Sequence, residues 1–309
     1  MAIKLPICVV PLPLGTITTG NERLSFPASH LDLEQDAGMV WRSNGNGNLY
    51  VRGDFGTARN VDFVALMSSN AASSTTIRVR LGDSQAEVDG TADYDSGVLP
   101  FISPAIVNPS GIYHSHLEMP SAQNKQWWRI DIGGHTGDFQ ASTLVMGQRI
   151  TLSRYYDQGF GFGIEDLGTI QFGQTGVVNE EYGIILRTLR FRLSWMTEAE
   201  WEQTFRPILE GRGQRGFLYW CLDPEPHAYR QNKTYLGPTQ KTPSVVASQK
   251  AGTYAIEFEV VSPYVLSVPD SIGTVVTPPP PPPPPPPPSG PTLFGYGKTS
   301  FGFSGSARA

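Results

Sequence analysis

The amino-acid sequence predicts an all-β protein built of β-sandwiches or barrels with a single helix. Two observations support this prediction: many short segments alternate apolar and polar residues with a period of two, and turn residues separate these segments. The 309 residues include 33 glycines and 27 prolines, while 39% are hydrophobic and only 17% are charged. This composition is typical of a globular chain with frequent turns, which favours sandwiches and barrels.

Period-two patterns mark the candidate strands along the chain. The first region, Val61–Met67, is apolar at every position except Asp62 and predicts a central strand that is covered on both faces. Later segments place apolar residues on one face and charged or small residues on the other, which predicts antiparallel strands with one buried face. These segments are Ile77–Leu81, Trp128–Ile132, Leu189–Trp195 and Tyr254–Val260.

One helix is expected after the strand that ends at Trp195. Thr197 and Glu200 form a capping-box pattern, in which a hydroxyl and a carboxylate bind backbone N–H groups of the first turn. The helix is predicted over Glu198–Glu210, ending at Gly211, with Trp201, Phe205, Ile208 and Leu209 on its buried face. Pro207 removes one internal hydrogen bond, so we expect a kink or an early end there.

The C-terminal end changes character. Eleven consecutive prolines, Pro278–Pro288, predict a polyproline II spacer of roughly 34 Å, at ~3.1 Å per residue. Beyond it, four aromatic residues alternate with glycines in a segment too short to fold alone: Phe294, Tyr296, Phe301 and Phe303. Aromatic rings are unfavourable in water, so we expect these residues to dock on a partner protein; a solvated tail is the alternative.

Charge, cysteine count and motifs exclude several functions. A formal net charge of −5 does not fit binding to nucleic acid through its phosphates. Cys8 and Cys221 are in no metal-ligand spacing, and Cys8 is expected to be a buried, inert thiol. No run approaches 18 apolar residues, so no membrane insertion is expected. No nucleophile elbow, phosphate loop or zinc motif is present, so we expect neither an enzyme nor a cofactor.

Two pairs of residues are candidates for binding a metal or a glycan. His114 and His116 have the spacing of strand neighbours on one face, but two histidines without a third ligand are a weak metal signal, and a surface loop is the preferred interpretation. Trp127 and Trp128 place one ring inward and one outward in a strand. The outward ring is a candidate glycan-binding platform, although a partner interface is equally compatible.

The first half of the chain resembles a known module. Phe63–Asn70, Thr76–Leu81, Tyr94–Pro100 and Trp127–Ile132 follow the order seen in jelly-roll modules of siphophage minor tail proteins, which resemble galactose-binding-like carbohydrate modules. The resemblance covers Ala28–Arg154 and implies a jelly-roll β-sandwich.

The second half resembles the belt domain of phage distal tail proteins. The resemblance rests on Leu189–Leu193, the capped helix, Gly216–Trp220 and Tyr254–Val260. It implies a β-sandwich or barrel with one helix that assembles into a homo-oligomeric ring. The implied organisation is a belt domain over residues 1–27 and 155–270, a jelly-roll module over 28–154, a polyproline linker over 271–288 and a docking peptide over 289–309. The alternative is a module that is not inserted but precedes a complete second domain.

Composition and resemblance together predict a structural baseplate or tail-tip protein of a phage virion, assembled in the host cytoplasm. Its expected partners are the tail tube, the hub and a tail fibre or receptor-binding protein, which the C-terminal peptide holds. The alternative is a lectin-like tail module that binds host-surface glycans through Trp127 or Trp128. A polysaccharide-cleaving enzyme is disfavoured, because the adjacent carboxylates Glu165 and Asp166 point to opposite faces of a strand.

Overall fold

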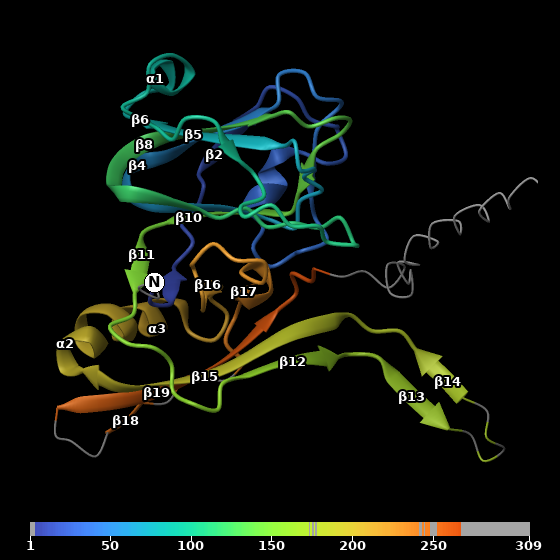
Figure 1. Ribbon diagram of the computed structural model, residues 1–309, viewed down its shortest axis with the longest axis vertical. Helices are drawn as coiled ribbons and strands as arrows, with labels where there is room; N and C mark the ends of the chain where they lie inside the picture. Colours follow the sequence, from blue (N-terminus) through green and yellow to red (C-terminus); the bar gives the residue numbers. More distant parts are fainter. Residues whose placement is uncertain are drawn as a thin grey trace, which may run out of the picture. The chain divides into compact units, whose positions relative to one another are not determined.

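The computed structural model describes residues 4–172, 174, 176, 178–240, 243, 245–247 and 252–266, and over them the chain is all-β, as predicted (Figure 1). Residues 12–147, here called the module, contain a seven-stranded antiparallel sheet. Residues 4–11 and 148–266, here called the two-sheet domain, contain two four-stranded sheets and a helix. No helix in this part of the chain is long and apolar enough to cross a membrane.

The strands of the module are arranged in the order β10-β4-β8-β5-β6, with β2 added to β4 and β7 added to β5. Two register shifts in the β4–β8 pairing, between Asp54 and Arg59 and between Val61 and Phe63, act as bulges that bend this long pair. The bounds are β2 Thr16–Thr19, β4 Tyr50–Met67, β5 Thr76–Gly82, β6 Tyr94–Asp95, β7 Leu99–Pro100, β8 Leu117–Gly133 and β10 Thr143–Gly147. Shorter elements complete it: η1 Ala28–Asp32, β3 Trp41–Arg42, α1 Gln85–Asp89 and β9 Gln140–Ala141.

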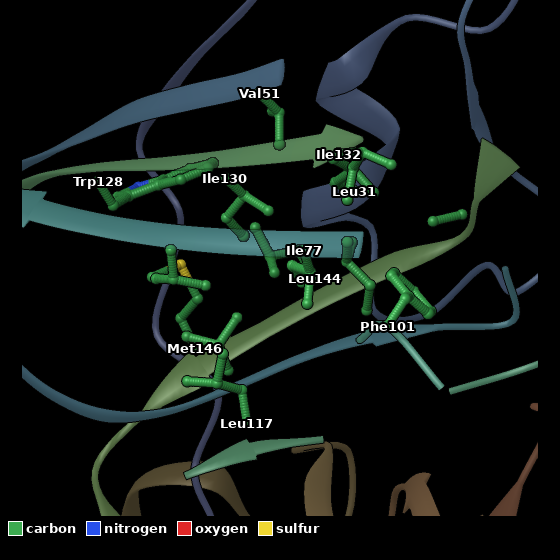
Figure 2. Packing of buried hydrophobic residues seen from close by; sticks show 14 of the residues in the cluster. Leu31, Val51, Ile77, Phe101, Leu117, Trp128, Ile130, Ile132, Leu144 and Met146 are labelled. Atoms are coloured by element: carbon green, nitrogen blue, oxygen red, sulfur yellow. The ribbon is translucent and has the colours of Figure 1, made fainter. Parts of the chain in front are cut away.

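The core of the module comes from the alternation seen in the sequence. Ile77 in β5 and Ile130 and Ile132 in β8 are buried together with Leu144 and Met146 of β10 (Figure 2). Each large apolar side chain that is fully buried stabilises the fold by about 1.5–3 kcal/mol relative to exposure. Because the two register shifts bend β4 and β8, the seven-stranded sheet folds over a single core.

The second half of β4 is covered on both faces, as its continuous apolar run predicts. Val64 and Leu66 enter the module core, whereas Phe63, Ala65 and Met67 pack against the two-sheet domain. The covering sheet has the order β11-β1-β16-β17. Its strands are β1 Ile7–Val9, β11 Arg149–Thr151, β16 Leu218–Cys221 and β17 Thr234–Gly237, with η3 Gln231–Lys233 before β17.

The pairing of β1 shows how the module is connected. Cys8 lies opposite Trp220 of β16 and Ile150 of β11, so the N-terminal strand lies between two strands from later in the chain. The module therefore leaves and re-enters one sheet, which is the topology of an insertion. The connections differ from the expected residues, because β2 pairs with β4 inside the module and β11 pairs with β1 outside it.

The second sheet of the two-sheet domain has the order β12-β15-β19-β18 and packs its inner face on β1 and β16. Its bounds are β12 Gly161–Asp166, β15 Ile185–Thr197, β18 Val245–Ala247 and β19 Thr253–Ser262. Phe191 of β15 lies opposite Phe258 of β19, and both rings contact Trp220 of the other sheet. These aromatic contacts form the centre of the domain core.

The expected helix forms, with an internal irregularity. It consists of α2 Glu198–Glu200, the π-helical segment η2 Trp201–Phe205 and α3 Arg206–Arg212. The hydroxyl oxygen of Thr197 accepts a hydrogen bond from the backbone N–H of Glu200, which is the first half of the predicted capping box. The second half does not form, because the Glu200 carboxylate accepts hydrogen bonds from the backbone N–H and the hydroxyl of Ser153 instead. Because Pro207 cannot donate the hydrogen bond that an α-helix needs, the preceding turn widens into a π-helix instead of ending the helix.

Candidate binding surfaces

The two tryptophans proposed as glycan platforms lie on opposite faces of β8. The Trp128 side chain is 0% exposed, packs against the backbone of Gly53, and donates from Nε1 to the carbonyl oxygen of Leu14 at 3.3 Å. It is a core residue and presents no surface to a ligand. Trp127 is half-buried on the outer face of the module, so of the two only this ring has surface that a sugar could contact.

The outer face around Trp127 is a network of compensated charges. The carboxylate of Asp89 accepts hydrogen bonds from Arg52 and Arg129, and the Arg129 guanidinium lies over the ring of Tyr50 at 3.8 Å. Although partial burial raises the pKa of Asp89, these two guanidinium groups outweigh it and lower that pKa. The face is therefore rigid and ionised at neutral pH.

A shallow groove of about 270 Å³ lies on the same face, between β5 and the end of β8. Arg78, Arg80 and Asp131 provide its polar lining, and Val98 part of its apolar lining. Arg80 and Asp131 form an ion pair at 2.7 Å, while Arg78 pairs with Asp95. Saturated ion pairs of this kind leave few polar atoms free for a ligand, so this groove is a weak candidate.

The two histidines lie in the interior and not in the surface loop that we expected. His114 and His116 precede β8, and burial lowers the pKa of His114 to about 3, so its imidazole is neutral. His116 contacts the Tyr219 hydroxyl at 3.1 Å and the Glu118 carboxylate at 3.0 Å. Burial is a non-local property, and the sequence carried no sign that a second domain covers this segment.

One acidic group in the described residues has the spacing of a cation site. Asp83, Glu87 and Asp93 bring one carboxylate oxygen each within 4.8 Å of one another. The ammonium group of Lys125 already lies between Asp83 and Asp93, and the Glu87 carboxylate accepts the Asp83 backbone N–H at 2.6 Å. The chain itself therefore already supplies a cation between two of these carboxylates and a hydrogen-bond donor to the third.

The strands β12, β13 Thr169–Phe172 and β14 Val178–Glu181 form a projecting segment, here called the arm (residues 161–184; Figure 1). Ile170 pairs with Glu180 and Phe172 pairs with Val178, so three apolar side chains share one face of the β13–β14 ribbon with the carboxylate of Glu180. The exposed fraction is 65% for Ile170, 75% for Phe172 and 45% for Val178. Thr169, Gln171, Asn179 and Glu181 occupy the opposite face.

An amphipathic two-stranded ribbon needs a surface to cover it. A single hairpin is marginally stable in water, and exposed apolar patches on soluble proteins mark interaction sites. Further exposed apolar residues flank the ribbon: Ile164, Leu167, Tyr182 and Ile184. This surface was not predicted from the sequence, because the short segments that form β12, β13 and β14 do not show which of their faces lacks a partner.

The predicted docking residues Phe294, Tyr296, Phe301 and Phe303 lie outside the described residues, as do the polyproline tract and the domains assigned to 271–309.

No protein family matches the chain by sequence, and no curated protein matches it. Similar solved structures include chitosan-binding module 1 of a chitosanase/glucanase from Paenibacillus sp. IK-5, at 15% identity over 45% of this chain and 98% of that chain, with a TM-score of 0.33. A Streptococcus pneumoniae fucose-binding module has 9% identity over 45% of this chain and 95% of its own, with a TM-score of 0.35. A family 32 carbohydrate-binding module from C. perfringens NanJ, in complex with galactose, has 15% identity over 45% and 98%, with a TM-score of 0.33. Similarity at this level does not assign a ligand to this chain.

Proposed function

We propose that this chain is a non-catalytic structural protein that joins copies of itself through the arm and carries a module that binds glycans. The observation that supports assembly is the exposed apolar face formed by Ile170, Phe172 and Val178. Closed symmetric homo-oligomers are the commonest assemblies of soluble proteins, so a second copy is the proposed occupant of that face. We propose that this assembly is part of the tail tip of a phage virion, which the sequence resemblance to distal tail proteins supports.

Assembly is tested by light scattering coupled to size-exclusion chromatography on the full chain. We expect a closed oligomer that becomes monomeric when Ile170→Asp and Phe172→Asp are combined, because the two new carboxylates replace the apolar contacts and add to the charge of Glu180 that assembly would have to desolvate. The matched control combines Thr169→Asp and Gln171→Asp on the polar face of the same strand and should stay oligomeric. A wild-type chain that is monomeric at all concentrations would contradict the proposal.

Glycan binding is the second proposed function, and Trp127 is the residue that favours it. It is also the function for which the similar solved modules are named. On an array of host-surface glycans, Trp127→Ala in the full chain should weaken binding by about twofold to tenfold, since an aromatic stacking contact contributes on the order of 0.5–1.5 kcal/mol. Trp195→Ala, which removes an exposed tryptophan from the two-sheet domain, should leave binding unchanged.

We further propose that the C-terminal peptide holds a fibre or receptor-binding protein. Its four aromatic residues and their glycine spacers support this role. Particles whose protein lacks Leu293–Ala309 should assemble normally and lose their fibres; a full fibre complement on such particles would refute the role.

A further inference from the structure

A wide groove lies where the module meets the two-sheet domain. Its volume is about 750 Å³, within the range of about 300–1,000 Å³ that is usual for small-molecule sites. One wall of the groove is the bulged part of β4 with Asn124 of β8. The second wall is the edge strand β11 with residues 10–12, which follow β1. The third wall is formed by η2 and α3. β11 and the helix are neighbours below the seven-stranded sheet (Figure 1).

The lining of this junction groove has an unusual chemistry for an acidic chain. No acidic residue is among the described residues that line it, although the whole chain carries 28 Asp and Glu against 23 Lys and Arg. The polar lining consists of guanidinium, amide and hydroxyl groups: Arg59, Arg149, Arg212, Asn60, Asn124, Gln148, Gln203, Thr151 and Thr204. Aromatic rings are absent from the lining residues that the structure describes.

The three arginines differ in how they are held. Arg149 pairs with Glu118 and donates to the Met119 carbonyl oxygen, and Arg212 donates to the Pro11 carbonyl oxygen, so both are fixed in place. Arg59 is exposed and forms neither a hydrogen bond nor an ion pair with any described side chain. Its guanidinium is therefore available to a carboxylate, which it can bind through two parallel hydrogen bonds.

The amides are partly pre-ordered. Asn124 Nδ2 donates to Asn60 Oδ1 at 2.8 Å across β4 and β8, which orients these two amides relative to each other. The remaining amide groups offer donors and acceptors in equal number, as sugar hydroxyls require. A nucleic-acid strand would need a longer cationic surface, and a protein partner would favour aromatic anchors, so neither fits this lining as well.

We propose that the junction groove binds a saccharide that carries carboxylate groups, with Arg59 contacting the carboxylate and the Asn60–Asn124 pair contacting the ring hydroxyls. This inference rests on the glycan-binding part of the proposed function, and it places an acidic-sugar site away from Trp127. The groove exists only when the module and the two-sheet domain are packed together, because each supplies part of its lining.

The test is isothermal titration calorimetry of the full chain with tetragalacturonic acid and with its uncharged methyl ester. We expect the acid to bind, the ester to bind at least about tenfold more weakly, and added salt to weaken only the acid. Arg59→Gln should reduce affinity for the acid by about tenfold, and Gln203→Ala on the helical wall should reduce it by a smaller factor. Arg206→Gln is the matched control, because this arginine lies on the same helix but pairs with Glu202 and Glu210.

Each other result has a defined meaning. Acid binding that survives Arg59→Gln and is lost in Trp127→Ala would overturn the groove site and leave the glycan function intact. Equal binding of acid and ester would overturn the acidic class, and equal binding of a polyglutamate peptide would overturn the saccharide assignment. No binding of either sugar would overturn the groove; if the glycan array is also negative, the glycan function fails with it.

Discussion

Glu34 is a carboxyl group in an unfavourable position. It lies close to Tyr264, whose hydroxyl donates to the Glu34 carbonyl oxygen at 2.8 Å, and its nearest cation is Arg212 at 3.9 Å. Burial raises the pKa of Glu34 to about 7; the charge of Arg212 opposes this rise, whereas that of Asp32 adds to it. The folded chain therefore holds a proton on Glu34 at pH values where the unfolded chain has released it.

The sign of the pH effect follows from that difference. Between the unfolded pKa near 4.5 and the folded pKa near 7, the folded state binds more protons, so stability falls as pH rises through this window. Between pH 5 and pH 8, the free energy of unfolding of Glu34→Gln should fall by about 1 kcal/mol less than that of the wild type, after discounting for solvent screening. Urea unfolding at both pH values measures it, with Glu210→Gln on the exposed helix surface as control. Parallel pH slopes for wild type and Glu34→Gln would show that this carboxyl titrates normally.

At the scale of elements, the helix depends on its N-terminal cap. The Thr197 hydroxyl satisfies the Glu200 N–H, and the buried face behind it carries Phe205. Thr197→Ala should lower the free energy of unfolding by about 1 kcal/mol, whereas Thr197→Ser keeps the hydroxyl and should be nearly neutral. Chemical denaturation of the two variants side by side measures the difference; equal losses would mean that the methyl group, and not the cap, matters.

Local patterns predicted the elements whose signal is local. The alternation in β5, β8, β15 and β19, the doubly covered end of β4 and the capped helix all follow from residues within a single segment. Before Pro207 the sequence predicted a kink or an early end, and the structure has a π-helical turn. Which of these forms depends on the hydrogen bonds that the neighbouring turns make in place of the one that proline cannot donate. The position of Trp128 followed from period two, but which of Trp127 and Trp128 was buried depended on the fold of Leu14 and Gly53 against it.

Surfaces were much less predictable than strands. The junction groove combines residues that are up to about two hundred positions apart in the sequence. The apolar face of the arm is exposed because no other described segment packs on it, which the sequence does not show. The burial of His116 has the same origin, because the covering residue Tyr219 is 103 positions away. Sequence periodicity reports which face of an element is apolar, and tertiary packing decides whether that face is covered.

At the scale of the whole described chain, the module and the two-sheet domain share a core. Phe63 of β4 is fully buried, with its ring centroid 4.7 Å from that of Tyr219 and 5.0 Å from that of His116. Polar contacts reinforce the junction: burial alone would raise the pKa of Glu118, but the hydrogen bond from His116 and the charges of Lys4 and Arg149 outweigh it and hold that pKa at about 2. The two parts are therefore expected to unfold together.

Differential scanning calorimetry of the full chain tests this coupling. Wild type should show one cooperative transition for the described part, because neither part can leave the other without exposing the shared core. Phe63→Ala should cost about 3–5 kcal/mol and split the transition in two, since it removes a buried ring that packs on Tyr219 across the junction. Phe101→Ala, a deletion of the same size inside the module core, should lower the melting temperature without the same splitting. Two separate transitions in the wild-type chain would mean that the junction adds little stability, and the groove that depends on it would then open and close in solution.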